Sequence, residues 1–234
     1  MKKFRKGTEM AKFFFLSFFL LCIFSAAAAQ ERFVEPVDEA KRDASFFAFR
    51  EKLIEAARKR DAKHILSVLD RNIMNDFGGG SGIEDFKKKW KVENSDSKFW
   101  KEFTAVIENG GTFSEETGGA AKIFTAPFTF AAFPEDLDAF QHAVIFGKNV
   151  NLRARPDLNS ETVARLSYNV VKVNYENSVR NAARKDEYSW LKVKTLGGKR
   201  GYIRADYVRS PIDYRAGFQK KNGVWKMIYF IAGD

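Results

Sequence analysis

Cysteine and histidine are scarce in this chain of 234 residues. Its one cysteine, Cys22, lies in the N-terminal segment, and its two histidines, His64 and His142, are far apart in sequence. Without a second cysteine the chain forms no internal disulfide, and beyond the N-terminal segment it has no cysteine nucleophile. Two isolated histidines lack the spacing of a metal site. We therefore predict no metal site and no cofactor, and we assign no catalytic residue.

Patterns that often belong to enzymes are incomplete here. Residues 78–82 read Gly-Gly-Gly-Ser-Gly, but the Gly-Lys-Ser/Thr that completes a phosphate-binding loop does not follow. Ser81 is not in a Gly-x-Ser-x-Gly elbow, because Ile83 holds the last position. Carboxylates are plentiful, but sequence does not show whether two of them flank a cleft. We interpret residues 78–82 as a turn between helices, with anion binding beside Lys87–Lys89 as the alternative.

The first 29 residues have the three parts of a secretory signal peptide. An apolar run at 13–24, too short to cross a bilayer comfortably, is followed by the small residues Ala26–Ala29. We expect cleavage near Ala29 and export to the periplasm or the exterior, with an uncleaved membrane anchor as the alternative. The basic residues that precede the apolar run are Lys2, Lys3, Arg5, Lys6 and Lys12.

Positive charge is in modest excess. The chain has 40 basic and 30 acidic residues, and its leader holds five of the bases and one acid, Glu9, so the remainder carries a net charge of +6. A solvated surface accounts for that excess, and export argues against nucleic acid as a partner. Anionic envelope polymers and lipid head groups remain open as partners.

Residues 30–43 are polar and read as a linker before a helical region. Apolar residues recur every three or four positions from Ala44 to Ala57 and again from Asp61 to Ile73. Two further helices are expected, one beginning near Ile83 with Ser81 as its cap, and one ending at Gly110-Gly111. Residues 123–133 read as an edge strand or a bulged strand, because Pro127 lies inside the run.

The C-terminal residues 213–231 have the pattern of a β-hairpin. Asn222-Gly223 favours a type I′ turn, and Trp225, Met227 and Tyr229 give one strand an apolar face. A lone hairpin is marginal in water, so it must pack against other elements. We expect it to pair with the 123–133 strand and to complete a discontinuous α+β domain of residues 44–140 and 211–234.

Short strands and turns occupy residues 144–209. Alternation along residues 150–155 places Val150, Leu152 and Ala154 inside and the intervening Asn and Arg residues outside. The same rule places Leu191 and Val193 in the core and leaves Tyr188 and Trp190 partly outside. Gly197-Gly198 reads as a hairpin turn. The pattern predicts a small all-β barrel.

This segment resembles the bacterial Src-homology-3 domain, a small barrel of exported envelope proteins. The resemblance implies a binding module. Two departures are Tyr168-Asn169, where the family has glycine and where asparagine would tolerate a positive φ, and the long charged loop at 176–187. The matching residues, in order, are Val150–Arg155, Pro156, Trp190, Val193, Gly198, Gly201, Tyr202, Ile203 and Tyr207.

The rest of the chain has a second, shorter resemblance. The hairpin residues Phe218–Met227 are similar to the closing strands of the nuclear-transport-factor-two-like cone fold, in which initial helices lie over a curved sheet. Residues 44–109 would supply those helices. The resemblance implies an interior that is either an open pocket or a packed core.

Aromatic and arginine side chains of the barrel are the candidate binding residues. Aromatic rings stack on sugar faces or on apolar peptide groups, and a guanidinium pairs bidentately with a carboxylate. The competing interpretation is that a small barrel buries its aromatic rings to enlarge its core. The candidates are Arg153, Arg155, Tyr188, Trp190, Tyr202 and Arg204.

These features favour an exported, non-catalytic binding protein whose barrel binds cell-wall glycopeptide or a protein partner in the envelope. The alternative is an envelope hydrolase or accessory enzyme with its active site in the cone and the barrel as a targeting module. A third interpretation is an assembly protein, which a strongly apolar exposed face would indicate. An open polar interior in the first domain would favour the enzyme, and an interior packed with phenylalanine would favour the binding protein.

Overall fold

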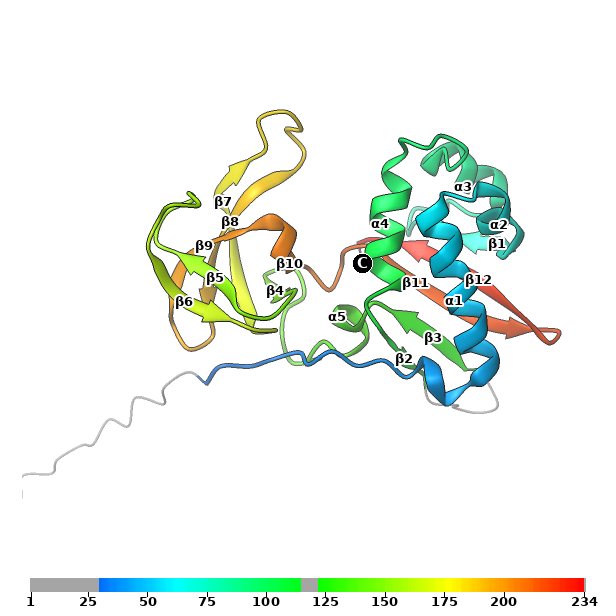
Figure 1. Cartoon of the computed structure of the whole chain (residues 1–234), viewed down its shortest axis with the longest axis horizontal. Helices are drawn as coiled ribbons and strands as arrows, with labels where there is room; N and C mark the ends of the chain where they lie inside the picture. The colour runs from blue at the N-terminus through cyan, green and yellow to red at the C-terminus, as the bar shows by residue number, and fades with distance from the viewer. Residues whose placement is uncertain (1–29, 115–121, 234) are drawn as a thin grey trace, which may run out of the picture.

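The computed structural model describes residues 30–114 and 122–233, which form two units, each with its own β-sheet (Figure 1). One unit combines helices with a five-stranded sheet, and the other is a curled sheet of seven short strands. The predicted α+β class is confirmed. The predicted leader, residues 1–29, lies outside the described residues. The predicted domain boundaries remain a prediction.

Capping side chains and a residue with left-handed backbone mark the ends of the longer helices in the first unit. In helix α1 (Ala44–Lys59), the Asp43 carboxylate accepts a hydrogen bond of 2.9 Å from the Phe46 amide, and Arg60 ends the helix with a φ of 56°. The Ser97 side chain caps α4 in the same way. The other helices are η1 (Ala40–Arg42), α2 (Ala62–Ser67), α3 (Ile83–Trp90), α4 (Lys98–Ile107) and α5 (Phe128–Ala131).

The expected helix from Asp61 to Ile73 is wrong in its second half. Helix α2 ends at Ser67, and strand β1 (Leu69–Met74) follows, parallel to the last strand of the chain. Leu69 and Ile73 are both buried, and residues four apart share a face in a strand as well as in a helix. The spacing therefore did not distinguish the two structures, and long-range pairing decided between them.

Two other local predictions need correction. The strand expected at 123–133 ends early, because β3 (Ile123–Ala126) stops at Pro127 and α5 begins directly after it. Proline has no N–H for a sheet, but it is tolerated at the start of a helix. Ser81 does not cap α3: Gly82 holds that position, with a φ of 87°, while Ser81 pairs with Met74.

The C-terminal hairpin completes the first unit, as predicted. Its strands, β11 (Arg215–Lys221) and β12 (Val224–Ile231), lie between β1 and β3, so the sheet order is β1-β12-β11-β3-β2, with β2 at Thr112–Phe113. Strand β11 is antiparallel to β3, with Phe218 opposite Phe124. In Figure 1 the red and orange hairpin lies behind α1 and α4.

One residue of the hairpin does not lie on its predicted face. A β-bulge between Gly217 and Phe218 shifts the register of β11 against β12, so Phe230 is buried in the core and Tyr229 turns away from it. The Tyr229 ring lies against Gly217, where a Cβ atom would come within 2.2 Å of it. The Tyr229 hydroxyl and the Thr125 hydroxyl are 2.8 Å apart.

Aromatic side chains fill the space between the helices and the sheet. The Phe46 ring lies 4.3 Å from the Phe124 ring, and the rings of Phe99 and Phe103 stack at 4.9 Å between centroids. All of these rings are fully buried. The concave side of the first unit is therefore a packed core and not an open pocket. The other large, fully buried side chains of this core are Trp90, Phe86, Phe218, Phe230, Leu53, Ile65, Ile73 and Ile107.

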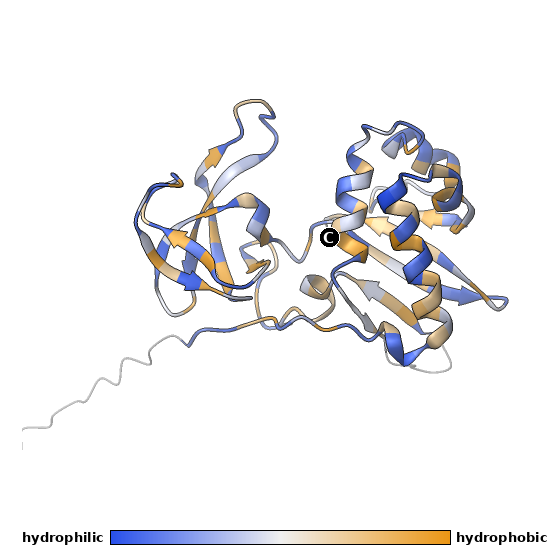
Figure 2. Ribbon diagram, in the orientation of Figure 1, coloured by the Kyte–Doolittle hydropathy of each residue, from blue (hydrophilic) through white to orange (hydrophobic). Residues whose placement is uncertain are grey.

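The second unit is the predicted barrel. Val150 and Leu152 are 7% and 0% exposed and point into its core with Leu191, Val193 and Ile203, which confirms the inward face. Apolar and polar residues alternate along its strands in Figure 2. The strand order is β10-β4-β7-β8-β9-β5-β6. The strands are β4 (His142–Ile145), β5 (Val150–Arg153), β6 (Thr162–Leu166), β7 (Val170–Arg180), β8 (Tyr188–Thr195), β9 (Arg200–Arg204) and β10 (Val208–Arg209), with η2 (Ala205–Tyr207) before β10.

Four barrel predictions need correction. Ala154 is exposed, because β5 bulges after Leu152 and ends at Arg153. Trp190 is only 8% exposed, so it is not the partly open ring expected. The positive φ of 59° in the turn after β6 falls on Tyr168 and not on Asn169. Part of the expected loop at 176–187 is strand, because β7 continues to Arg180 and forms a long arm with β8 (Figure 1).

Residues 30–43 run alongside both units. The Val34 amide donates to the Tyr168 carbonyl at 2.9 Å in the barrel, and the Gly111 amide of the first unit donates to the Val37 carbonyl at 2.8 Å. The buried Arg50 guanidinium binds both Asp38 carboxylate oxygens at 2.7 Å. This segment is the blue stretch of chain below both units in Figure 1, and it contacts both of them.

Candidate functional site

The outer face of strands β8 and β9 brings together four of the predicted binding residues. Trp190 lies directly opposite Arg204, and Tyr202 lies opposite both Lys192 and Arg153. Directly opposite residues in a sheet share a face, so these side chains alternate with the inward-facing Leu191, Val193 and Ile203. The face combines aromatic rings with cations from three adjacent strands.

Contacts on this face hold the side chains in place. The Arg204 guanidinium lies 6.0 Å from the Trp190 ring and binds Asp206 at 2.9 Å, and the Lys192 ammonium lies 5.7 Å from the Tyr202 ring. Arg153 donates to the Ser160 carbonyl at 2.7 Å. Tyr202 and Arg204 are half-buried, so both keep surface for a ligand, whereas Trp190 mainly supports them from below.

The remaining two predicted residues lie elsewhere. Arg155 is exposed in the loop after β5, where its amide donates a hydrogen bond of 2.9 Å to the Ser160 hydroxyl. Tyr188 lies at the start of β8, 5.7 Å from the Tyr175 ring and 4.1 Å below the Arg180 guanidinium. The structure thus gathers Arg153, Trp190, Tyr202 and Arg204 and separates Arg155 and Tyr188 from them. A ligand role for any of the six remains a prediction.

A basic groove borders this face, and its residues were not singled out from sequence. It has a volume of 560 Å³ and follows β7, β8 and the start of β9. Its cations are Lys172, Lys192, Lys194 and Arg200, and its acid is Glu176. The signal available in sequence was a lysine at alternate positions of Val-Lys-Val (171–173) and Leu-Lys-Val-Lys (191–194). That pattern indicates one polar face per strand but not which strands lie together.

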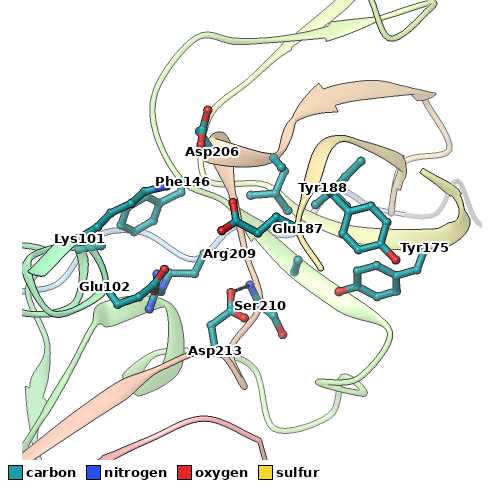
Figure 3. A pocket seen from close by; sticks show the side chains of 15 residues that line it. Lys101, Glu102, Phe146, Tyr175, Glu187, Tyr188, Asp206, Arg209, Ser210 and Asp213 are labelled. Carbon is teal, nitrogen blue, oxygen red and sulfur yellow. Dashed lines mark hydrogen bonds between the residues drawn. The ribbon is translucent and has the colours of Figure 1, made fainter. Parts of the chain in front are cut away.

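A second hollow, of 380 Å³, lies between the two units (Figure 3). Helix α4 contributes Lys101 and Glu102 on one side, and the barrel contributes Tyr175 and Tyr188 on the other. Arg209 is buried at its floor, where it donates to the Tyr214 carbonyl at 2.7 Å. We call this hollow the inter-unit cleft.

Acidic groups line the inter-unit cleft, but two of them have cationic partners. Glu187 binds Arg184 at 3.1 Å, and Asp206 binds Arg204 at 2.9 Å. The other two are Glu102, on α4, and Asp213. Asp213 as a whole is exposed to solvent, but many protein atoms surround its carboxyl group. The resulting desolvation raises the pKa of this carboxyl, and the positive charge of Arg209 offsets only part of that effect. The cleft is thus a polar junction between the units.

Neither histidine lies in a metal-like cluster. His64 is on α2 of the first unit, and His142 is on β4 of the barrel, where its Nδ1 lies 2.9 Å from the Asp138 carbonyl. Within residues 30–114 and 122–233, no group of three or more His, Cys, Asp or Glu side chains is placed to hold a metal ion. Over the same residues, no helix is both long and apolar enough to pass through a bilayer.

Comparison with known proteins identifies the barrel. Residues 148–209 match the family model of the bacterial SH3 domain, which covers about a quarter of the chain. The resemblance expected from sequence is therefore confirmed for this segment, and the barrel is a module of a binding and targeting family. No curated protein matches the chain.

Proposed function

We propose that this protein is an exported, non-catalytic binding protein whose barrel binds cell-wall glycopeptide or a protein partner in the envelope. The ligand-contacting surface is the outer face of β8 and β9, with Tyr202 as the stacking ring and Arg153 and Arg204 as carboxylate partners. An aromatic ring beside guanidinium groups suits a ligand that combines sugar or apolar peptide surface with free carboxylates.

The observation that carries this proposal is the packed interior of the first unit. An enzyme of the cone type would need an open, polar cavity between its helices and its sheet, but Phe46, Phe103 and Phe124 are fully buried there. The predicted binding face lies on the barrel, which belongs to a binding family. Signal-like residues at the N-terminus support export.

Retention on purified peptidoglycan tests the proposal. The chain without its predicted leader is incubated with peptidoglycan stripped of attached phosphate polymers, and the bound fraction is compared with that of Tyr202→Ala and Arg153→Ala. We expect both variants to lose most of the retention shown by the parent. Trp190→Ala is unsuitable, because Trp190 is buried and its removal would destabilise the barrel.

Two substitutions in the first unit serve as matched controls. Phe77→Ala removes an exposed ring, and Arg71→Ala removes an exposed guanidinium, both far from the barrel in sequence and on the first unit. These variants should be retained like the parent. Equal retention of all five proteins, or no retention of the parent, would contradict the proposed function.

A further inference from the structure

Three cations lie in register across three adjacent barrel strands. Lys172 on β7 is directly opposite Lys194 on β8, and Lys194 is directly opposite Arg200 on β9. All three side chains are exposed and line the basic groove. We call these residues the cation row. The next register row, Asn174–Lys192–Tyr202, adds a fourth cation beside it.

Such an arrangement works against the stability of the barrel. Directly opposite side chains in a sheet have Cβ atoms about 5 Å apart, and like charges at that distance destabilise the pairing. Among the described residues no carboxylate forms an ion pair with Lys172, Lys194 or Arg200. Elsewhere the same chain does pair its cations, as in Lys221–Asp70 at 2.7 Å. The three cations of the row therefore repel one another, and no ion pair with a carboxylate offsets that repulsion.

We propose that the cation row binds a linear polyanion whose charges are phosphate groups. A chain lying along the groove across β7, β8 and β9 would place successive anions beside successive cations and replace repulsion with attraction. Lysine predominates, with Lys172, Lys192 and Lys194 against one arginine. Lysine binds phosphate as a point charge, and arginine can add two parallel hydrogen bonds to the same group.

The shape of the site favours a chain over a membrane surface. The cations line a groove of 560 Å³ on the face of β7, β8 and β9, and a narrow polymer can enter a groove more readily than a flat layer of head groups can. Tyr175 also lines the groove, and Tyr202 lies in the next register row, opposite Lys192. This site goes beyond the proposed function, because it uses different residues and a different ligand chemistry.

Binding of inorganic polyphosphate tests the inference. Titrations use the leader-free chain and a triple variant, Lys172→Gln, Lys194→Gln and Arg200→Gln. The matched control is Lys52→Gln, Lys63→Gln and Lys98→Gln, which removes three exposed charges from the first unit, so the two triple variants have the same net charge. Because local charge density and not net charge governs the contact, we expect about a tenfold weaker affinity in the row variant and less than about a twofold change in the control.

Salt dependence supplies a second readout. Each phosphate that is neutralised releases bound counterions, so the slope of log affinity against log salt concentration should become shallower in the row variant than in the control. Equal weakening of both triple variants would overturn the inference, since it would indicate net charge alone. Failure of the parent to bind polyphosphate would overturn it as well.

Other anions separate the possible sources. Polyglutamate of equal charge should bind more weakly than polyphosphate, and equal binding would overturn the preference for phosphate. The protein should not co-sediment with phosphatidylglycerol vesicles. Co-sedimentation that is lost in the row variant, in a protein that does not bind polyphosphate, would indicate that the ligand is a membrane surface instead. A parent that is retained on peptidoglycan but does not bind polyphosphate contradicts this inference alone. A parent that binds polyphosphate but is not retained on peptidoglycan contradicts the proposed function alone.

Discussion

Lys194 is the centre of the cation row, so reversing its charge should stabilise the barrel. In the parent, Lys194 faces Lys172 on one side and Arg200 on the other. The substitution Lys194→Glu converts two repulsive pairs into two attractive ones. Lysine and glutamate have similar, low β-propensity, so the substitution changes charge more than backbone preference.

The expected gain follows from the two cross-strand pairs. An exposed pair of opposite charges contributes about 0.2–1 kcal/mol, and like charges cost a similar amount. Because screening by water and salt limits each pair, we expect the free energy of unfolding to rise by about 0.5–2 kcal/mol at low salt. For a chain of this size, that gain corresponds to an increase in Tm of about 1–8 °C.

Thermal unfolding followed by circular dichroism measures the effect, at low salt and at about 1 M salt, where the Debye length falls to about 3 Å. The gain should shrink at high salt, and Lys194→Gln should show about half of it. A lower Tm for Lys194→Glu, or a gain that is independent of salt, would refute the reasoning that the row is repulsive.

Three further predictions concern the barrel core, the Arg50–Asp38 ion pair and the inter-unit cleft. Leu152→Ala should lower the free energy of unfolding by about 2–5 kcal/mol in urea titrations, because Leu152 is fully buried in the barrel core; a loss below about 1 kcal/mol would contradict that placement. Asp38→Asn should cost about 2–3 kcal/mol, because it leaves the buried Arg50 guanidinium without its charge partner, although Asp38 itself is partly exposed; an unchanged urea midpoint would count against the ion pair. Desolvation raises the pKa of Asp213, so its carboxyl contributes stability at low pH that is lost as pH rises through that pKa. Asp213→Asn should therefore be more stable than the parent at neutral pH and lose this advantage near pH ~4, and an advantage independent of pH would refute the assignment.

Local patterns predicted the barrel well. Val150 and Leu152 alternate with polar neighbours over a stretch too short to be a helix, so strand periodicity placed both correctly. Asn222-Gly223 fixed the hairpin turn, because both residues accept the positive φ that the turn requires. The apolar faces of the hairpin then required a partner, which the structure supplies as β3.

Features that depend on long-range pairing were not predictable. Leu69 and Ile73 fit a helix and a strand equally, and only the parallel pairing with β12 decides for β1. The bulge beside Gly217 reverses the face of Tyr229, which simple alternation cannot anticipate.

The candidate site was predicted only in part from the sequence, because it too depends on long-range strand pairing. The aromatic and arginine residues could be singled out by type, but Tyr188 and Trp190 were assigned to one open face, whereas the structure buries Trp190 and places Tyr188 at the inter-unit cleft. The cation row depends on the register among β7, β8 and β9, which no single strand encodes.

Amide chemical shifts of the isotope-labelled, leader-free chain, recorded as soluble peptidoglycan fragments are added, test most directly whether the barrel is the binding unit. The largest changes should fall on β8 and β9 around Tyr202 and Arg204, while the amides of the first unit, around Phe46 and Phe103, should stay unchanged. Changes concentrated in the first unit, or no changes at saturating fragment, would contradict the assignment of ligand binding to the barrel.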